Sequence, residues 1–197
     1  MICSRYIACA VAMSAGACGS DGGQRDDVVR YVGTVSNTDA RIAVIRDHAG
    51  TLAYVCGGPD SMASHTRWLM AATGGNAVAL EADGWRLELR LAGDALSGAL
   101  RDPAGASVKV MATHPRDAAG GLYGATTSDC RTGVIVYDGA DGPAVQGVWC
   151  DGSGAIAQVD PIPPPKELTG AGFAVTAQPI APEQLQVLPV LPADLLR

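Results

Sequence analysis

The chain has 197 residues, a formal net charge of -6 and a pI near 4.9. This length suits one domain with appendages. The acidic balance does not supply the positive field that phosphate binding requires, so nucleic acid is not an expected partner, and it disfavours electrostatic adhesion to anionic lipid.

The first residues have the form of a signal peptide. Arg5 precedes a run of about a dozen uncharged, mostly apolar residues, which is too short to cross a bilayer of roughly 30 Å as a helix. Small residues at 15–17 then stand directly before Cys18. This ending resembles the lipobox of bacterial lipoproteins, although Ala15 stands where leucine is usual. The resemblance implies that residues 1–17 are removed and that Cys18, acylated on its thiol, becomes the new N-terminus.

The residues from Cys18 onward predict a tether and a destination. Residues 18–28 are polar and contain glycine, which is typical of a flexible linker. Gly19 follows the cysteine, whereas in lipoproteins of Gram-negative cells an aspartate there tends to hold the protein at the inner membrane. The resemblance therefore implies export and a lipid anchor on the periplasmic side of the outer membrane. The alternative is an ordinary signal peptide cut near Ala17, which leaves Cys18 a plain thiol.

From Val28 onward, short apolar runs alternate with turn signals every eight to twelve residues or so, a spacing typical of an all-β domain. In the run from Trp85 to Leu91, apolar and charged residues alternate with the period of a strand. Asp83-Gly84, directly before it, predicts a hairpin turn. We expect strands near residues 30–36, 41–46, 51–57, 66–72, 76–82, 85–92, 95–101, 106–112, 121–127, 131–137, 144–150 and 155–159.

These runs predict an antiparallel meander of about nine to twelve short strands, closed as a small barrel or folded as a sandwich, because an open sheet would leave unpaired edges. We expect this β-barrel-like domain over residues 29–160. Residues 60–72 could form a helix, but we favour a loop followed by a strand. Gly98 within a strand indicates a bulge or a close approach of backbone.

Two segments show a weak internal repeat. Tyr31 begins the first and Cys56 ends it, while Tyr123 and Cys150 hold the same places in the second, and an aspartate begins a turn in each. We expect two similar three-stranded meanders, one early and one late, unless the similarity is the chance likeness of two hairpins.

The composition changes after Asp160. Residues 161–165 are rich in proline, which cannot donate to a strand ladder and favours polyproline II, and proline recurs towards the C-terminus. We therefore expect a Pro-rich tail over residues 161–197 that packs along the barrel or presents a docking segment.

The cysteines predict a disulfide. Two of the six fall in the signal peptide and Cys18 takes the lipid, which leaves Cys56, Cys130 and Cys150 in an oxidising compartment. Folding about the turn at 138–142 brings Cys130 nearly opposite Cys150, within the Cα separation of roughly 4.4–6.8 Å that a cystine needs. We expect this pair to be joined and Cys56 to be buried; the rival pairing joins Cys56 to either of the other two. No cysteines have the close spacing of a metal site.

The sequence contains no clear catalytic or metal-binding motif. Ser61, His65 and Asp60 supply the groups of a serine hydrolase, but no nucleophile elbow surrounds a serine. His48 and His114 lie in turn-like settings without the spacing of metal ligands. We therefore expect no catalytic residue, no metal and no cofactor.

Other charged and aromatic residues have structural interpretations. Glu81 and Glu88 could pair as carboxylates, but Glu88 alternates with arginines, which favours a solvated, salt-bridged face. Three aspartates near glycine-rich turns lack the pattern of a calcium loop and are interpreted as turn residues: Asp138, Asp141 and Asp151. The tryptophans are expected to anchor the core rather than to stack a ligand: Trp68, Trp85 and Trp149.

These observations favour a cell-envelope lipoprotein whose β domain is not catalytic and binds or scaffolds a partner. The expected partners are the membrane, through the lipid anchor, and an envelope protein or a small apolar ligand. Two alternatives stay open: an envelope hydrolase with an unrecognised active site, and a protease-inhibitor-like module with an exposed rigid loop at 58–65. A cleft dense in acidic, histidine and serine side chains would favour the enzyme, and an apolar cavity or patch would favour binding.

Overall fold

The structure is a computed structural model that describes residues 28–71, 75–127, 130–150, 153, 155–162, 173–178 and 181–190. The predicted signal peptide and Cys18 lie outside these residues. Within them, every regular element is a β-strand except α1 (Met62–His65), a single helical turn. The predicted all-β fold of antiparallel strands is confirmed.

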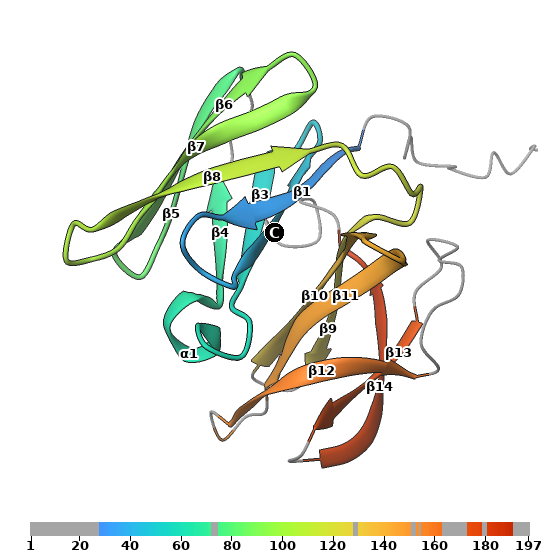
Figure 1. The fold of residues 1–197 in the computed structure, drawn as a ribbon. Helices are drawn as coiled ribbons and strands as arrows, with labels where there is room; N and C mark the ends of the chain where they lie inside the picture. The colour runs from blue at the N-terminus through green and yellow to red at the C-terminus, as the bar shows by residue number, and fades with distance from the viewer. Residues whose placement is uncertain are drawn as a thin grey trace, which may run out of the picture.

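The first eight strands form a closed antiparallel barrel (Figure 1). Each strand pairs with the next along the chain, and the last returns to pair with the first. The strands are β1 (Val29–Val35), β2 (Arg41–Arg46), β3 (Thr51–Cys56), β4 (Arg67–Ala71), β5 (Ala77–Ala82), β6 (Trp85–Ala92), β7 (Ala95–Arg101) and β8 (Ser107–Thr113).

The remaining strands close a second, smaller barrel in the order β10-β11-β12-β13-β14-β9. They are β9 (Gly121–Thr127), β10 (Cys130–Gly139), β11 (Gly142–Cys150), β12 (Ile156–Ile162), β13 (Phe173–Gln178) and β14 (Ala181–Pro189). The structure thus differs from the expected single barrel over 29–160 followed by a tail. Strands β13 and β14 arise from the segment expected to be that tail, and Pro182 and Pro189 take the second and last positions of β14, near strand ends where proline is tolerated.

The local patterns behave as the sequence predicts. Leu87 and Leu89 of β6 are buried, and the charged residues between and beside them are exposed. Asp83 and Gly84 both have positive φ, 50° and 78°, as a type I′ hairpin turn requires. Of the segment 60–72, the described residues 60–71 form a loop with one helical turn and then β4, which agrees better with the predicted loop and strand than with a long helix.

Strands β2 and β3 are covered on both faces. Ala53 and Val55 of β3 point into the core of the first barrel, whereas Leu52 and Tyr54 point the other way, into a second cluster. That second cluster joins the two barrels, because it also contains Leu122, Ile135 and Val148 from β9, β10 and β11. All six residues of β3 are therefore buried, and the strand is continuously apolar except for Thr51 at its start.

Tyr54 is the largest fully buried side chain in this interface and is 1% exposed. Its ring contacts Trp68 at 4.4 Å between centroids and lies over Gly133 of β10. A Cβ atom at Gly133 would stand 2.4 Å from the Tyr54 Cζ atom, so a glycine is needed for the ring to fit. Burial raises the pKa of the Tyr54 hydroxyl well above its usual range, which keeps it neutral.

Hydrogen bonds from glutamines add a polar seam beside this contact. The Gln146 amide of β11 donates to the carbonyl oxygens of Cys56, at 2.8 Å, and of Asp39, at 3.2 Å. The Gln158 amide of β12 donates to the carbonyl oxygen of Gly57 at 2.9 Å. Carbonyl groups at the end of β3, directly after it and just before β2 thus accept hydrogen bonds from the second barrel.

The internal repeat of the sequence corresponds to a repeat of structure. Strands β1–β3 and β9–β11 are both antiparallel three-stranded meanders. Tyr31 pairs with Val44 in the first, and Tyr123 pairs with Val134 in the second. The third strand of each ends at a cysteine. These two meanders are the parts of the barrels that pack against each other.

The contact between Tyr54 and Gly133 gives a stability prediction. Gly133→Ala should lower the free energy of unfolding by about 1–3 kcal/mol, because the added methyl overlaps the ring and the backbone of β10 must shift. Urea denaturation measures this change.

Tyr54→Leu serves as the matched background for this test. A shorter side chain leaves room for the methyl, so Gly133→Ala should cost less in the Tyr54→Leu protein than in the wild type. An equal loss of unfolding free energy in both backgrounds would show that residues 54 and 133 are not in steric conflict.

Candidate functional site

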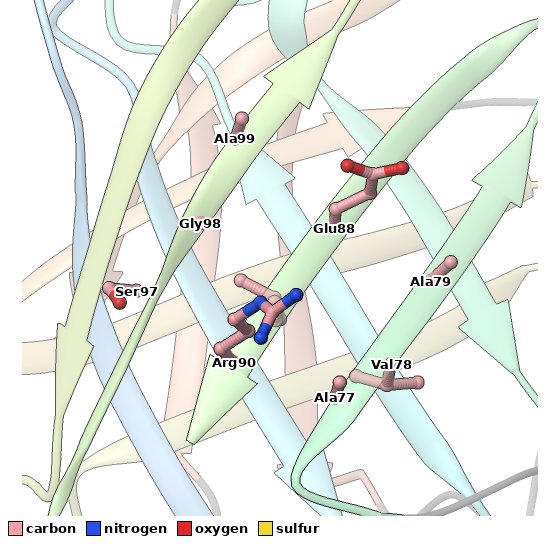
Figure 2. A pocket seen from close by; sticks show the side chains of 9 residues that line it. Ala77, Val78, Ala79, Glu88, Arg90, Ser97, Gly98 and Ala99 are labelled. Atoms are coloured by element: carbon pink, nitrogen blue, oxygen red, sulfur yellow. The ribbon is translucent and has the colours of Figure 1, made fainter. Parts of the chain in front are cut away.

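The outer face of β5, β6 and β7 carries a hollow of about 550 Å³. Figure 2 shows Arg90 and Glu88 standing on the central strand β6, between smaller side chains on its neighbours. The lining consists of Ala77, Val78, Ala79, Glu88, Leu89, Arg90, Ser97, Gly98 and Ala99. The hollow exists because the outward positions of β5 and β7 that line it hold alanine and serine, whose short side chains leave the backbone uncovered.

Gly98 permits the close packing of the floor. A Cβ atom there would stand 1.8 Å from the carbonyl oxygen of Glu88 on the neighbouring strand. The close backbone approach predicted for this glycine is confirmed, and any side chain at 98 would push β7 away from β6.

The charges around the hollow are unevenly paired. Arg86 binds Glu81 at 2.6 Å and Glu88 at 2.8 Å, as the predicted salt-bridged face requires. These two carboxylates, led by the hydrogen bond to Glu88, raise the pKa of the Arg86 guanidinium. Arg90 forms no ion pair with any described residue, so its charge is available to a partner.

Sequence reasoning did not single out this face. The signal was present as a combination of two patterns: charges alternating along residues 86–90, and small residues at alternate positions in the strands on either side. Each pattern by itself is common, and the register that aligns them is visible only in the structure.

Asp39 organises the loop at 58–65, the candidate inhibitor loop. Its carboxylate accepts hydrogen bonds from the Ser61 hydroxyl and, at 2.8 Å, from the backbone N–H of Asp60. These bonds, the one from Ser61 first, hold the pKa of Asp39 below its usual value despite an opposing effect of burial. The loop is thus fixed, but it contains the helical turn α1, whose backbone lacks the extended form with which a segment adds to another protein's sheet.

The candidate hydrolase residues do not come together. The Ser61 hydroxyl donates its hydrogen bond to the carboxylate of Asp39. Asp60 is exposed, and its backbone N–H donates to the same carboxylate. The Nδ1 atom of His65 lies 2.9 Å from the hydroxyl of its neighbour Ser64 instead. Three groups in these separate roles cannot relay a proton from serine through histidine to aspartate.

His65 belongs to a small cluster with Arg67 and Trp85. The guanidinium of Arg67 lies 3.5 Å from the centroid of the Trp85 ring, and the His65 ring meets the same indole edge-on at 5.7 Å. Burial, followed by the nearby charge of Arg67, lowers the pKa of His65. This indole is therefore covered by the protein's own side chains, which leaves less of it for stacking a ligand.

The other candidate residues have mainly structural contacts. All three tryptophans pack against buried clusters, as expected of core anchors. His48 and His114 are both exposed. His114 stacks on Tyr31 at 4.4 Å, and its Nδ1 atom lies 2.9 Å from the carbonyl oxygen of Arg30. Asp138 accepts a hydrogen bond from the backbone N–H of Arg116, and Asp151 lies outside the described residues. Over the described ranges, no group of three or more His, Cys, Asp or Glu side chains could hold a metal ion.

The predicted disulfide is confirmed. Cys130 and Cys150 are joined across β10 and β11, with their Cα atoms 5.9 Å apart. A bond that closes a loop of this size stabilises by roughly 3 kcal/mol in the chain-entropy account. Cys56 is the buried free thiol that the sequence predicts, and burial raises its pKa to about 12, so it stays protonated and unreactive.

Comparison with known protein families, with curated proteins and with solved structures found no match for this chain. In the part of the chain that the structure describes, no helix has the length and apolar character needed to cross a membrane.

The lowered pKa of Asp39 predicts a pH-dependent contribution to stability. Because the folded pKa lies below the unfolded value of about 3.8, this carboxylate stabilises the fold at higher pH and loses that effect as the pH falls through the folded pKa. Asp39→Asn removes this charge and should destabilise the protein by about 0.5 kcal/mol at neutral pH, a small loss because solvent screens the carboxylate.

Denaturation of both proteins across pH tests this expectation. The difference in free energy of unfolding between the wild type and Asp39→Asn should be constant around neutral pH and should decrease in acid. A difference that does not change between neutral and strongly acidic conditions would mean that the charge of Asp39 contributes nothing to the loop.

Proposed function

We propose that this protein is an exported lipoprotein of the cell envelope, held to the membrane by acyl chains on Cys18, and that its barrels bind or scaffold an envelope partner without catalysis. The lipobox-like residues 15–18 and the polar stretch after them support the anchor. More than one acyl chain is needed for stable anchoring, and lipoprotein processing supplies them. In a Gram-negative cell the expected site is the periplasmic side of the outer membrane.

The observation that carries the binding role is the hollow on the outside of the first barrel. Leucines from four strands fill the interior of this barrel: Leu69, Leu80, Leu87, Leu89 and Leu100. An eight-stranded barrel is just wide enough for such filling, so a ligand is better accommodated on the outer surface than inside. The hollow offers the cation of Arg90, the carboxylate of Glu88 in its ion pair with Arg86, small side chains and exposed backbone, which together suit binding.

Cys18→Ser tests the anchor. The wild-type protein should partition into the detergent phase of a Triton X-114 separation and incorporate labelled palmitate. The serine variant should do neither, because serine cannot receive the thioether-linked lipid, and it should appear uncleaved or soluble.

Cys3→Ser is the matched control, since it removes a cysteine from the signal peptide and leaves Cys18 in place. It should behave as the wild type. A wild-type protein that stays in the aqueous phase, unlabelled, with a mature N-terminus elsewhere would reduce the proposal to secretion without an anchor.

A further inference from the structure

The wall of the first barrel made by β5–β8 carries more positive than negative charge, although the whole chain is acidic. Its outward positions hold four cations and two anions, a net charge of +2 against -6 for the chain: Arg86, Arg90, Arg101 and Lys109, with Glu81 and Glu88. All six side chains belong to exposed residues. We call this outer surface of β5–β8 the basic wall.

A single arginine forms ion pairs with both anions of the basic wall. Arg86 is in ion pairs with Glu81 and with Glu88. Among the residues that the structure describes, Arg90, Arg101 and Lys109 take part in no ion pair. Three cations are thus left without an ion pair, while Arg86 and its two glutamates together keep a charge of -1, which gives the wall its net +2.

The strand register places these cations around the hollow. Glu88 pairs with Ala99 and Ala99 with Lys109, while Arg90 lies two residues further along β6. Standard strand spacings then put Lys109 roughly 8 Å from Arg101 and roughly 12 Å from Arg90 at their Cα atoms. The floor between the cations is low, because small side chains of β7 form it (Figure 2).

An apolar contact adjoins the cations. Met111 of β8 is 63% exposed and pairs with Ser97, which in turn pairs with Arg90. The row from Arg90 to Met111 therefore offers a guanidinium, a hydroxyl and a thioether side by side. A partner that presents an apolar side chain beside its carboxylates on the same face would match this row better than a uniformly charged polymer.

We propose that the basic wall binds an extended acidic peptide segment of another exported protein, with its carboxylates on Arg90, Arg101 and Lys109. Side chains on one face of an extended chain recur at about 6.8 Å, so glutamates two and four residues apart span the separations of these cations. Arginine binds carboxylates through paired hydrogen bonds, and the open hollow lets the partner's backbone come close to β7. The described strands of this barrel are closed into a ring, so the segment binds through side chains rather than as an added strand.

This inference rests on the proposed binding role and gives it a surface and a partner chemistry. It does not depend on the anchor. If the lipidation test fails, the proposed peptide binding is unaffected. If the peptide test fails, the proposed lipid anchor is unaffected.

Fluorescence anisotropy with the full-length protein in detergent tests the inference. The probe is a fluorescein-labelled peptide of about eight residues, roughly 27 Å when extended, in which glutamate alternates with alanine. Its counterpart has glutamine in place of each glutamate. The acidic peptide should bind, the glutamine peptide should not, and binding should weaken as salt is added because exposed ion pairs are screened.

Variants assign the binding to the basic wall. Arg90→Gln combined with Lys109→Gln should weaken binding of the acidic peptide by about tenfold, as expected for the loss of two exposed ion pairs. Arg116→Gln removes one exposed cation outside the basic wall and should leave binding unchanged. Circular dichroism checks that each variant keeps the fold.

Three outcomes would overturn the inference. The two peptides could bind equally, the paired substitution could have no effect, or Arg116→Gln could weaken binding as much as the paired substitution does. A fourth measurement addresses the membrane as the partner: strong binding of the Cys18→Ser protein to vesicles of anionic phospholipid, without binding of the acidic peptide, would also overturn it.

Discussion

The burial of β2 and β3 on both faces is the constraint on which the rest of the structure depends. One face of these strands closes the core of the first barrel, and the other is closed by the second barrel through Tyr54, Leu52 and Ile45. Without the second barrel, these apolar side chains would face water at a cost of about 25 cal/mol for each Å² exposed. The two barrels are therefore expected to fold as one cooperative unit.

This packing also decides which surface is left for a partner. The first barrel uses β1–β3 to contact the second, so the opposite wall, β5–β8, faces away from it (Figure 1). That wall has a clean alternation of buried and exposed residues, in contrast to β3, because one of its faces is solvated. The hollow lies on this exposed side, together with the three cations that form no ion pair with a described residue. A partner on the basic wall is therefore compatible with the contact between the barrels.

Much of the fold follows from local pattern, and less of the candidate site does. The alternation of residues 85–92 and the turn at Asp83-Gly84 each depend on neighbours in the chain, so the hairpin they form was predictable. The second barrel was not predicted, because the prolines around and within β13 and β14 argue against strands there. In addition, the contact of Tyr54 with Gly133 joins residues far apart in sequence. The hollow was missed for a related reason: it needs the register of β5, β6 and β7 together.

Native-state hydrogen exchange tests the central claim, that the shared interface makes the two barrels one unit. The amides of β3 and of β10 should exchange with the same free energy of opening, equal to that of global unfolding, and should respond to urea with the same slope. A lower free energy of opening for the amides of β10, with those of β3 still protected, would contradict this claim. The second barrel would then unfold by itself and leave the side chains of β3 that face it exposed to water.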